Sequence, residues 1–511
     1  MLWFAVHLPW LSLEAFVATL GAEQRQRPVA LLADHRVQAV NATAAQAGVQ
    51  TGLKRATALA LAADLLCGQA DATRDAQALQ AVVHAALAFT PAVAVDGHTV
   101  LLEVASCLRY FGGADALLRR LRSALAPLGH RVQIAGAATA LGAALLARWR
   151  DDLADGPQRS QLAALQQLLD RAPVWLLGPG REHWEALQGM GLRHLGDLLR
   201  LPRAGLARRF GEDLLDDLDR ARGTRPDPRV WLTAPERFRC RLELAMRADH
   251  AEQVLHGAAL LLAQLVAWAQ ARRARVRAFT LCMHHEARYR PDAPTPAATE
   301  LRIELAEPAV DGAHLQGLLR ERLARVQLAA PTLELQLHCH ELALQEAPNA
   351  ELFPTRHSDQ LGLLRLIERL SARLGDEQVQ RLQPVADHRP ERASRTLPAL
   401  STLTGAAAVT ARVTATATAS TGDWPLTRPV WLLPDPLPLA ERQAMPLLEG
   451  RPLQLLVGPE RIESGWWDAD LATRDYFIAQ AMDGALVWVY RARLPVTDET
   501  QPLWFLQGRF G

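Results

Sequence analysis

The sequence predicts an α+β protein of several domains with a β-rich extension at its C-terminal end. Its 511 residues are too many for a single hydrophobic core. Residues 2–14 have the pattern of an apolar strand that runs into an amphipathic helix, and residues 93–113 add a pair of strands. Residues 160–222 are helical in pattern, whereas residues 236–345 alternate in the order β-α-β-β-α-β.

The composition is ordinary for a globular protein, with 49% hydrophobic residues and a net charge of +1. No apolar run has membrane-spanning length, and the N-terminus lacks the basic region and cleavage site of a signal peptide. The five cysteines stand far apart without a Cys-x-x-Cys motif, which favours reduced thiols. We therefore expect a cytoplasmic protein.

Two stretches carry a resemblance to the palm of Y-family (translesion) DNA polymerases. The first is residues 2–14, and the second is residues 93–104 with the Arg-Tyr-Phe-Gly-Gly that follows at 109–113. In that family the two strands carry Asp-x-Asp and Asp-Glu, which hold two divalent cations for nucleotidyl transfer. At the acid positions this chain has His7, Pro9, His98 and Thr99. The resemblance therefore implies a palm without catalytic residues, and we expect neither a metal site nor a cofactor.

The nucleotide grip of the family is also missing. Gly48 and Gly52 match the glycines of the fingers, but Ala42 and Ala45 stand where the family has the Tyr and Arg that hold the triphosphate. The Asn-Lys pair of the palm helix within residues 135–149 is likewise replaced by Ala, Leu and Gly. One alternative stays open, an active translesion polymerase whose metal acids come from Asp96, Glu103 or Glu14 in a shifted register.

The helical region resembles the thumb of the family, with two glycine-containing turns at residues 176–181 and 187–192. Such turns aim backbone N–H groups at a phosphate, and glycine permits close approach. A plain helical hairpin is the alternative. The residues expected to contact DNA are Gly178, Gly180, Arg181, Gly189 and Gly191.

The β-α-β-β-α-β segment resembles the little finger, the DNA-binding domain peculiar to this family. Alternate side chains of a strand share a face, so Arg273, Arg275 and Arg277 are expected to track a phosphate backbone. Arg237, Arg239 and Arg241 form a second such set on the first strand, although a solvated strand face is the alternative. Clusters at 282–286 and 338–341 contain Cys, His and Glu, but without Cys-x-x-Cys spacing they predict half-buried strands rather than a zinc site.

Residues 360–364, Gln-Leu-Gly-Leu-Leu, resemble the peptide with which polymerases bind the sliding clamp. The clamp contacts would be Gln360, Leu361, Leu363 and Leu364. The alternative is a helix stripe that packs in the core, formed by Leu363, Leu366, Ile367, Leu370 and Leu374.

The C-terminal part reads as a flexible linker rich in Ala, Thr and Ser at 394–423, followed by a module of aromatic strands at 424–511. Aromatic side chains dominate protein interfaces, although a self-contained β core uses them equally well. The expected partner-binding residues are Trp466, Trp467, Trp488, Trp504 and Phe505.

Together these features resemble the catalytically defective Y-family homologues of bacterial mutasomes. The resemblance implies an adaptor in DNA repair and damage-induced mutagenesis (the SOS response), located in the cytoplasm at the nucleoid. The implied partners are damaged primer–template DNA, the sliding clamp, an error-prone C-family DNA polymerase and the RecA-like accessory protein ImuA. The implied domains are palm (1–20 and 71–158), fingers (21–70), thumb (159–228), little finger (229–346), clamp peptide with its helix (347–393), linker (394–423) and C-terminal module (424–511).

Overall fold

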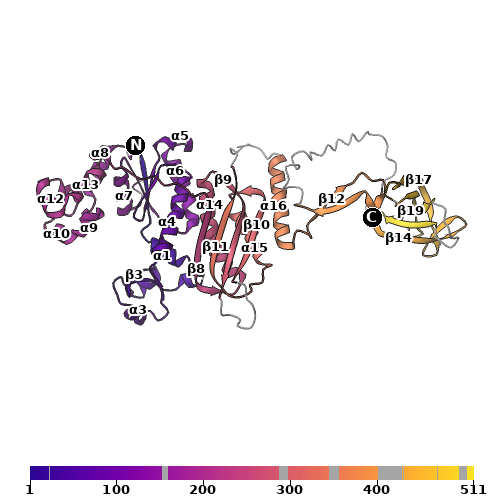
Figure 1. The fold of residues 1–511 in the computed structure, drawn as a ribbon, viewed down its shortest axis with the longest axis horizontal. Helices are drawn as coiled ribbons and strands as arrows, with labels where there is room; N and C mark the ends of the chain where they lie inside the picture. Colours follow the sequence, from indigo (N-terminus) through magenta and orange to yellow (C-terminus); the bar gives the residue numbers. More distant parts are fainter. Residues whose placement is uncertain are drawn as a thin grey trace. The chain divides into compact units, whose positions relative to one another are not determined.

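A computed structural model describes residues 1–21, 23–151, 153, 159–286, 297–344, 356–400, 428–429, 431–468, 470–493 and 503–510. The chain divides into two compact units, Met1–Arg373 and Leu374–Gly511 (Figure 1). Helices and sheets mix in the first unit, and the second is built mainly from strands, which confirms the predicted fold class.

A four-stranded antiparallel sheet of order β5-β6-β1-β7 forms the palm-like centre of the first unit. Apolar side chains of β1 are buried in two hydrophobic clusters that lie on either side of the sheet. The predicted strands at 2–8 and 93–104 are thereby confirmed. The elements are β1 (Trp3–His7), α4 (Ala72–Leu87), β5 (Val93–Asp96), β6 (Thr99–Glu103), α5 (Leu108–Phe111), α6 (Ala114–Leu125), β7 (Gln133–Ala137) and α7 (Ala140–Trp149).

A small sheet of order β3-β2-β4 makes the fingers-like part, next to α1 (Leu11–Val17). Asn41 begins α2, because its side-chain oxygen accepts a hydrogen bond from the Ala44 N–H at 2.9 Å. Gly48 and Gly52 both have φ of +87°, a conformation that favours glycine. The elements are β2 (Val29–Ala33), β3 (Arg36–Val40), α2 (Ala42–Gln46), α3 (Arg55–Leu61) and β4 (Leu66–Gln69).

Short helices form the thumb-like part, as predicted. They bury a row of leucines against α7, so this part shares a core with the palm sheet. The helices are α8 (Leu162–Arg171), α9 (Gly178–Glu182), α10 (Trp184–Gly189), α11 (Leu195–Leu198), α12 (Arg203–Phe210) and α13 (Glu212–Arg222).

The predicted β-α-β-β-α-β order is confirmed and gives a sheet of order β10-β9-β11-β8. Among the helices in the described part of the chain, α14 is long and apolar enough to cross a membrane. It also buries Leu261, Leu265 and Trp268 in the little-finger core, as a core helix does. The elements are β8 (Phe238–Ala248), α14 (Ala251–Ala271), β9 (Ala274–His285), β10 (Ala298–Ala309), α15 (Gly312–Leu323) and β11 (Thr332–Leu344), followed by α16 (Arg356–Leu374).

The second unit combines a β-hairpin with a seven-stranded sheet of order β16-β15-β14-β20-β19-β18-β17. Strand β13 (Ser394–Pro398) pairs with β12 (Gln380–Pro384), so the predicted linker is wrong over 394–398, and its residues 401–423 lie outside the described residues. The predicted aromatic strands are confirmed. The sheet consists of β14 (Trp431–Arg442), β15 (Met445–Leu448), β16 (Arg451–Pro452), β17 (Gln454–Ser464), β18 (Ala472–Gln480), β19 (Leu486–Ala492) and β20 (Trp504–Arg509).

Candidate functional site

Two of the residues expected at acid positions, His7 and Thr99, form a hydrogen-bonded group with Asp96 and the guanidinium of Arg148. Strand pairing places His7 directly opposite Thr99, and His7 Nδ1 lies 3.0 Å from Thr99 Oγ1. Arg148, on α7, donates from Nε to Thr99 Oγ1 at 3.4 Å. Its Nη2 donates to the Asp96 carboxylate at 2.8 Å and to the Asp96 carbonyl at 3.2 Å. We call these residues, His7, Asp96, Thr99 and Arg148, the Arg148 group.

The electrostatics of the Arg148 group oppose cation binding. Burial, together with the charge of Arg148, lowers the pKa of His7 to about 4. His7 is therefore neutral near pH 7. The single carboxylate of the group, Asp96, is already paired with Arg148. A fixed cation thus lies beside Thr99 and His7, two of the positions where metal-binding acids were expected.

Arg148 was missed by the sequence reasoning. The signal was present, because Arg148 is the first charged residue of the otherwise apolar helix α7. An arginine that follows eight buried positions of a core helix needs a polar partner at its end.

The other carboxylates proposed for a shifted metal site do not meet. Glu103 lies at the far end of β6, paired with Trp3, and accepts a hydrogen bond from the Ala105 N–H at 3.2 Å. Glu14, on α1, accepts a hydrogen bond from the Arg131 N–H at 3.0 Å. Across the described ranges, no group of three or more His, Cys, Asp or Glu residues could hold a metal ion.

Pro9 and His98 lie beside this group but add no charged ligand. Pro9 follows the end of β1 in a turn, and its ring offers no ligand atom. His98 is exposed in the turn between β5 and β6, where its carbonyl accepts a hydrogen bond from the Leu8 N–H at 3.0 Å.

Two residues of the fingers-like part, Ala42 and Ala45, offer only methyl groups to the space beside α1, which Arg25 and Asn41 also line. Ala42 and Ala45 are exposed and line a cavity of about 1260 Å³ together with Trp10. Since alanine has no side-chain donor, neither position can bind a triphosphate as Tyr or Arg would.

The two glycine turns of the thumb differ. Gly178 is exposed and Gly180 is buried, and both lie within helix α9, so the first is not the open turn that was predicted. A Cβ at Gly180 would meet the Val174 carbonyl oxygen at 2.3 Å, so this glycine is required for packing. Arg181 is exposed on the same helix.

The second turn matches the prediction better. Gly189 and Gly191 are exposed on either side of Met190, and Gly191 has φ of +79°. The N–H groups of Met190 and Gly191 donate to the carbonyls of Ala186 and Gln188, at 3.2 and 2.9 Å.

The little-finger sheet has an exposed face opposite its helices. Arg239 and Arg241 of β8 are exposed on this face, opposite His338 and Gln336 of β11. Arg241 is paired with Glu334 at 2.8 Å, so part of its charge is neutralised.

The three arginines expected on β9 are not equivalent. Arg273 precedes the strand in a turn with φ of +50°, so its expected place on the strand face is wrong. Arg277 is exposed, and Arg275 is half-buried with Glu307 at 3.8 Å. Among the Cys and His residues of these strands, Cys339 is buried and donates to the Ala278 carbonyl at 3.2 Å.

The predicted clamp peptide lies within helix α16, whose bounds are Arg356–Leu374. The side chains of Gln360 and Leu361 lie outside the described residues. Leu363 is 58% exposed and Leu364 is half-buried. The alternative, a packed stripe, is wrong, because the residues that face solvent are Leu363, Leu366, Leu370 and Leu374.

The opposite side of α16 packs instead. Glu368 is 5% exposed and lies 3.0 Å from His314 Nε2, and Ala372 belongs to the little-finger core.

The five aromatic residues expected to bind partners fall into two groups. Trp488 and Trp504 are buried in the sheet of the second unit, and Phe505 is half-buried against Tyr490. Trp488 and Trp504 are core residues, so assigning these two to a partner surface was wrong, whereas Phe505 is only partly buried. Trp466 and Trp467 are 78% and 55% exposed.

Comparison with known proteins defines the class. The pattern of the impB/mucB/samB family matches residues 12–148. Solved structures similar to this chain include an insertion ternary complex of Dbh DNA polymerase and DinB from Sulfolobus solfataricus. They have TM-scores of 0.38 and 0.36 at 14% and 15% identity, and each similarity covers 67% of this chain and 100% of the other. The chain thus carries this family pattern in its first unit, where helices and sheets mix, and has a β-rich C-terminal extension.

Two curated proteins extend the similarity along nearly the whole chain. Both are named Protein ImuB, from Caulobacter vibrioides strains NA1000 / CB15N and ATCC 19089 / CIP 103742 / CB 15. Each is 30% identical over 486 residues, which covers 91% of this chain and 100% of the relative. The chain belongs to the ImuB family.

Proposed function

We propose that this protein is a non-catalytic, Y-family polymerase-like adaptor in error-prone translesion synthesis. The observation that carries the proposal is the Arg148 group, in which one guanidinium and a neutral histidine replace the clustered carboxylates of an active palm. Nucleotidyl transfer requires those carboxylates to hold two cations. A palm that holds an arginine there keeps its fold and lacks the means to activate a primer hydroxyl.

Primer–template DNA, including damaged DNA, is the proposed ligand of the first unit. The exposed turn at Gly189–Gly191 permits close approach of a phosphate, and Arg239, Arg241 and Arg277 offer exposed cations on the little-finger sheet. These contacts are sequence-independent, as suits a protein that acts wherever synthesis stalls. A place at the nucleoid in the cytoplasm follows from this binding.

Three protein partners complete the adaptor. The segment Gln360–Leu364 is proposed to bind the sliding clamp. Its Leu363 side chain is exposed and is available for an apolar contact with the clamp. The C-terminal unit is proposed to bind an error-prone C-family DNA polymerase and ImuA. When the first unit is bound to DNA, its link to these three partners raises the local concentration of the active polymerase at a lesion.

Reconstituted lesion bypass tests the adaptor role. The C-family polymerase, clamp and ImuA are supplied with a primed template that carries an abasic site, with and without this protein. We expect bypass products only when this protein is present, and unchanged products when His7 is replaced by Ala. Equal bypass without this protein would overturn the proposal.

A further inference from the structure

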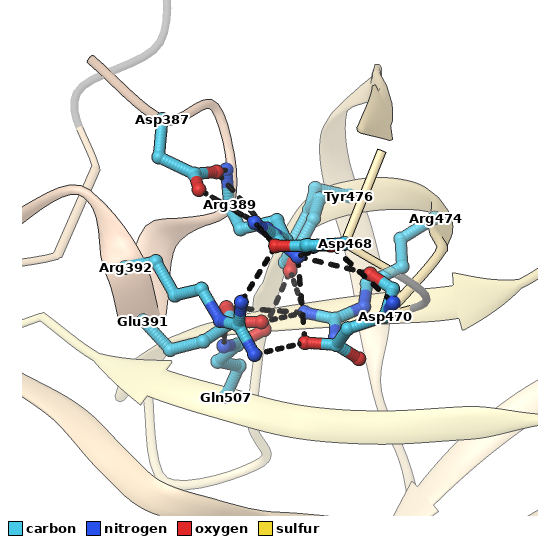
Figure 2. Close-up of polar contacts among 9 residues, drawn as sticks. All are labelled: Asp387, Arg389, Glu391, Arg392, Asp468, Asp470, Arg474, Tyr476 and Gln507. Carbon is cyan, nitrogen blue, oxygen red and sulfur yellow. Dashed lines mark hydrogen bonds and ion pairs between the residues drawn. The ribbon is translucent and has the colours of Figure 1, made fainter. Parts of the chain in front are cut away.

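A buried arginine in the second unit ties together two segments that are far apart in the sequence. Arg389 lies between β12 and β13 and is 2% exposed. It donates from Nε and Nη2 to the Asp387 carboxylate at 3.0 and 2.7 Å. It also donates from Nη2 and Nη1 to the two oxygens of Asp468, at 2.6 and 3.0 Å (Figure 2). All three nitrogens of the guanidinium are used.

The same arginine fixes the loop that carries the two exposed tryptophans. Its Nη1 donates to the carbonyl of Asp470 at 3.0 Å, so it holds the loop backbone as well as a side chain. Its Cζ lies 5.7 Å from the ring centroid of Trp467, which in turn contacts Trp466 edge-on at 5.4 Å. We call Trp466 and Trp467 the Trp tip.

Gly465 sets the entry to the loop. It has φ of +86°, and a Cβ there would meet the Asp470 carbonyl oxygen at 2.1 Å. The loop is therefore closed tightly below the Trp tip.

A second set of contacts secures the Arg389 segment to the sheet. Gln507 of β20 donates to Glu391 at 2.9 Å and accepts from the Tyr476 hydroxyl at 2.6 Å. Arg474 of β18 pairs with the same Glu391 at 2.9 Å (Figure 2). The segment between β12 and β13 is thus an integral part of the sheet domain.

We propose that Arg389 is a positioning residue that presents the Trp tip as a preformed docking site for a partner protein with an apolar pocket. The inference rests on the proposed function, which assigns partner binding to the C-terminal unit. Two indole rings held in solvent by a loop that Arg389 contacts leave apolar surface unburied, which the stability of the domain does not require. Rigid aromatic anchors are the residues that contribute most to interface affinity, because little entropy is lost on binding.

The charges around the Trp tip favour a protein over a nucleic acid. The side chains of Asp468 and Asp470 are 30% and 53% exposed beside the tryptophans and repel phosphates. Three carboxylates, Asp387, Asp468 and Asp470, pair with only two guanidiniums, Arg389 and Arg392, so the cluster keeps one net negative charge. A pocket with a basic rim suits this surface.

Binding measurements on the full chain test the proposal, with the purified C-family polymerase and purified ImuA as separate probes. Replacing both Trp466 and Trp467 by Ala should weaken binding to one probe by about tenfold or more. Arg389→Ala should also weaken that binding. Adding it to the tryptophan double variant should weaken binding no further, because Arg389 acts through the Trp tip. Arg461→Ala is the matched control, since it removes an Arg–Asp pair on β17 and leaves the loop intact.

A second variant, Asp468→Asn, distinguishes loss of positioning from loss of the fold. It removes the ion pair of Arg389 with Asp468 and keeps the ion pair of Arg389 with Asp387. It should weaken binding with an unchanged circular dichroism spectrum, even if Arg389→Ala unfolds the domain. Wild-type affinity in Asp468→Asn, or in the tryptophan double variant, would overturn the inference. If the wild-type protein binds neither probe, the proposed partner assignment fails instead.

Discussion

Arg148 Nη2 lies 2.8 Å from the Asp96 carboxylate, and Arg148 Nε lies 3.4 Å from the Thr99 hydroxyl that contacts His7. The palm thus carries an internal cation fixed by its own helix. The pairing links the stability of the palm sheet to Arg148, because the only carboxylate of the Arg148 group is neutralised by this residue of the core helix α7.

Loss of Arg148 should therefore destabilise the first unit. In Arg148→Met the partly buried Asp96 carboxylate and Thr99 hydroxyl lose a donor, which costs about 1–3 kcal/mol. Urea unfolding of the full chain measures this. Arg148→Lys should recover part of the loss, since it restores a charge at the same place. If Arg148→Met and the wild-type protein have equal free energies of unfolding, the Arg148–Asp96 pair contributes nothing to stability.

Stability should fall as the pH drops from about 6.5 towards 4. His7 and His84 each have a folded pKa lowered to about 4 by burial, from an ordinary value of 6.5. The unfolded state therefore binds more protons in this window, and stability rises with pH until both groups are neutral in both states. The thermal midpoint at pH 5 should lie below that at pH 7, and His7→Gln should reduce the difference. If His7→Gln shows the same difference in thermal midpoint between pH 5 and pH 7 as the wild-type protein, the pH dependence arises from groups other than His7.

Removing cations from the exposed little-finger face should weaken DNA binding and its salt dependence together. Arg239→Ala combined with Arg277→Ala removes two exposed charges, so the slope of log K against log salt should fall by up to about 2. Fluorescence anisotropy with primer–template DNA at several salt concentrations measures both quantities. Arg320→Ala, on the helical layer of the same domain, should change neither. An unchanged slope in the double variant would return this face to ordinary solvated surface.

Clamp binding should depend on the segment Gln360–Leu364. Replacing Gln360 and Leu361 by Ala removes an amide and an apolar side chain from the peptide, and we expect affinity for the purified clamp to fall at least about tenfold. Leu370→Ala is the control, because Leu370 is exposed on the same helix outside the peptide. Surface plasmon resonance against immobilised clamp checks both variants. If Leu370→Ala has the larger effect, the exposed leucine row binds the clamp and the peptide does not.

Periodicity was enough to predict the strands of the palm and the order of the little finger, because those patterns depend on local burial. Periodicity could not predict the partners of Arg148, because Asp96 and Thr99 lie on β5 and β6 and contact Arg148 only in the folded protein. The tryptophans of the C-terminal unit show the same limit. Composition marked Trp466 and Trp488 equally, whereas strand packing buries Trp488 and a loop exposes Trp466.

The start of the predicted linker failed for a related reason. Ser394–Pro398 has a loop-like composition, yet it pairs residue by residue with β12. Between these two strands, Arg389 reaches carboxylates about 80 positions later in the chain (79 for Asp468). A contact of that range leaves no trace in local composition.

Primer extension by the purified protein tests the central claim most directly. A primed template, all four deoxynucleotides and either Mg²⁺ or Mn²⁺ are supplied, with an active Y-family polymerase as the positive control. We predict no extended product with either metal, because the Arg148 group has no free carboxylate for a cation. Template-directed incorporation that is abolished by Asp96→Ala would contradict the account and show that the palm is catalytic.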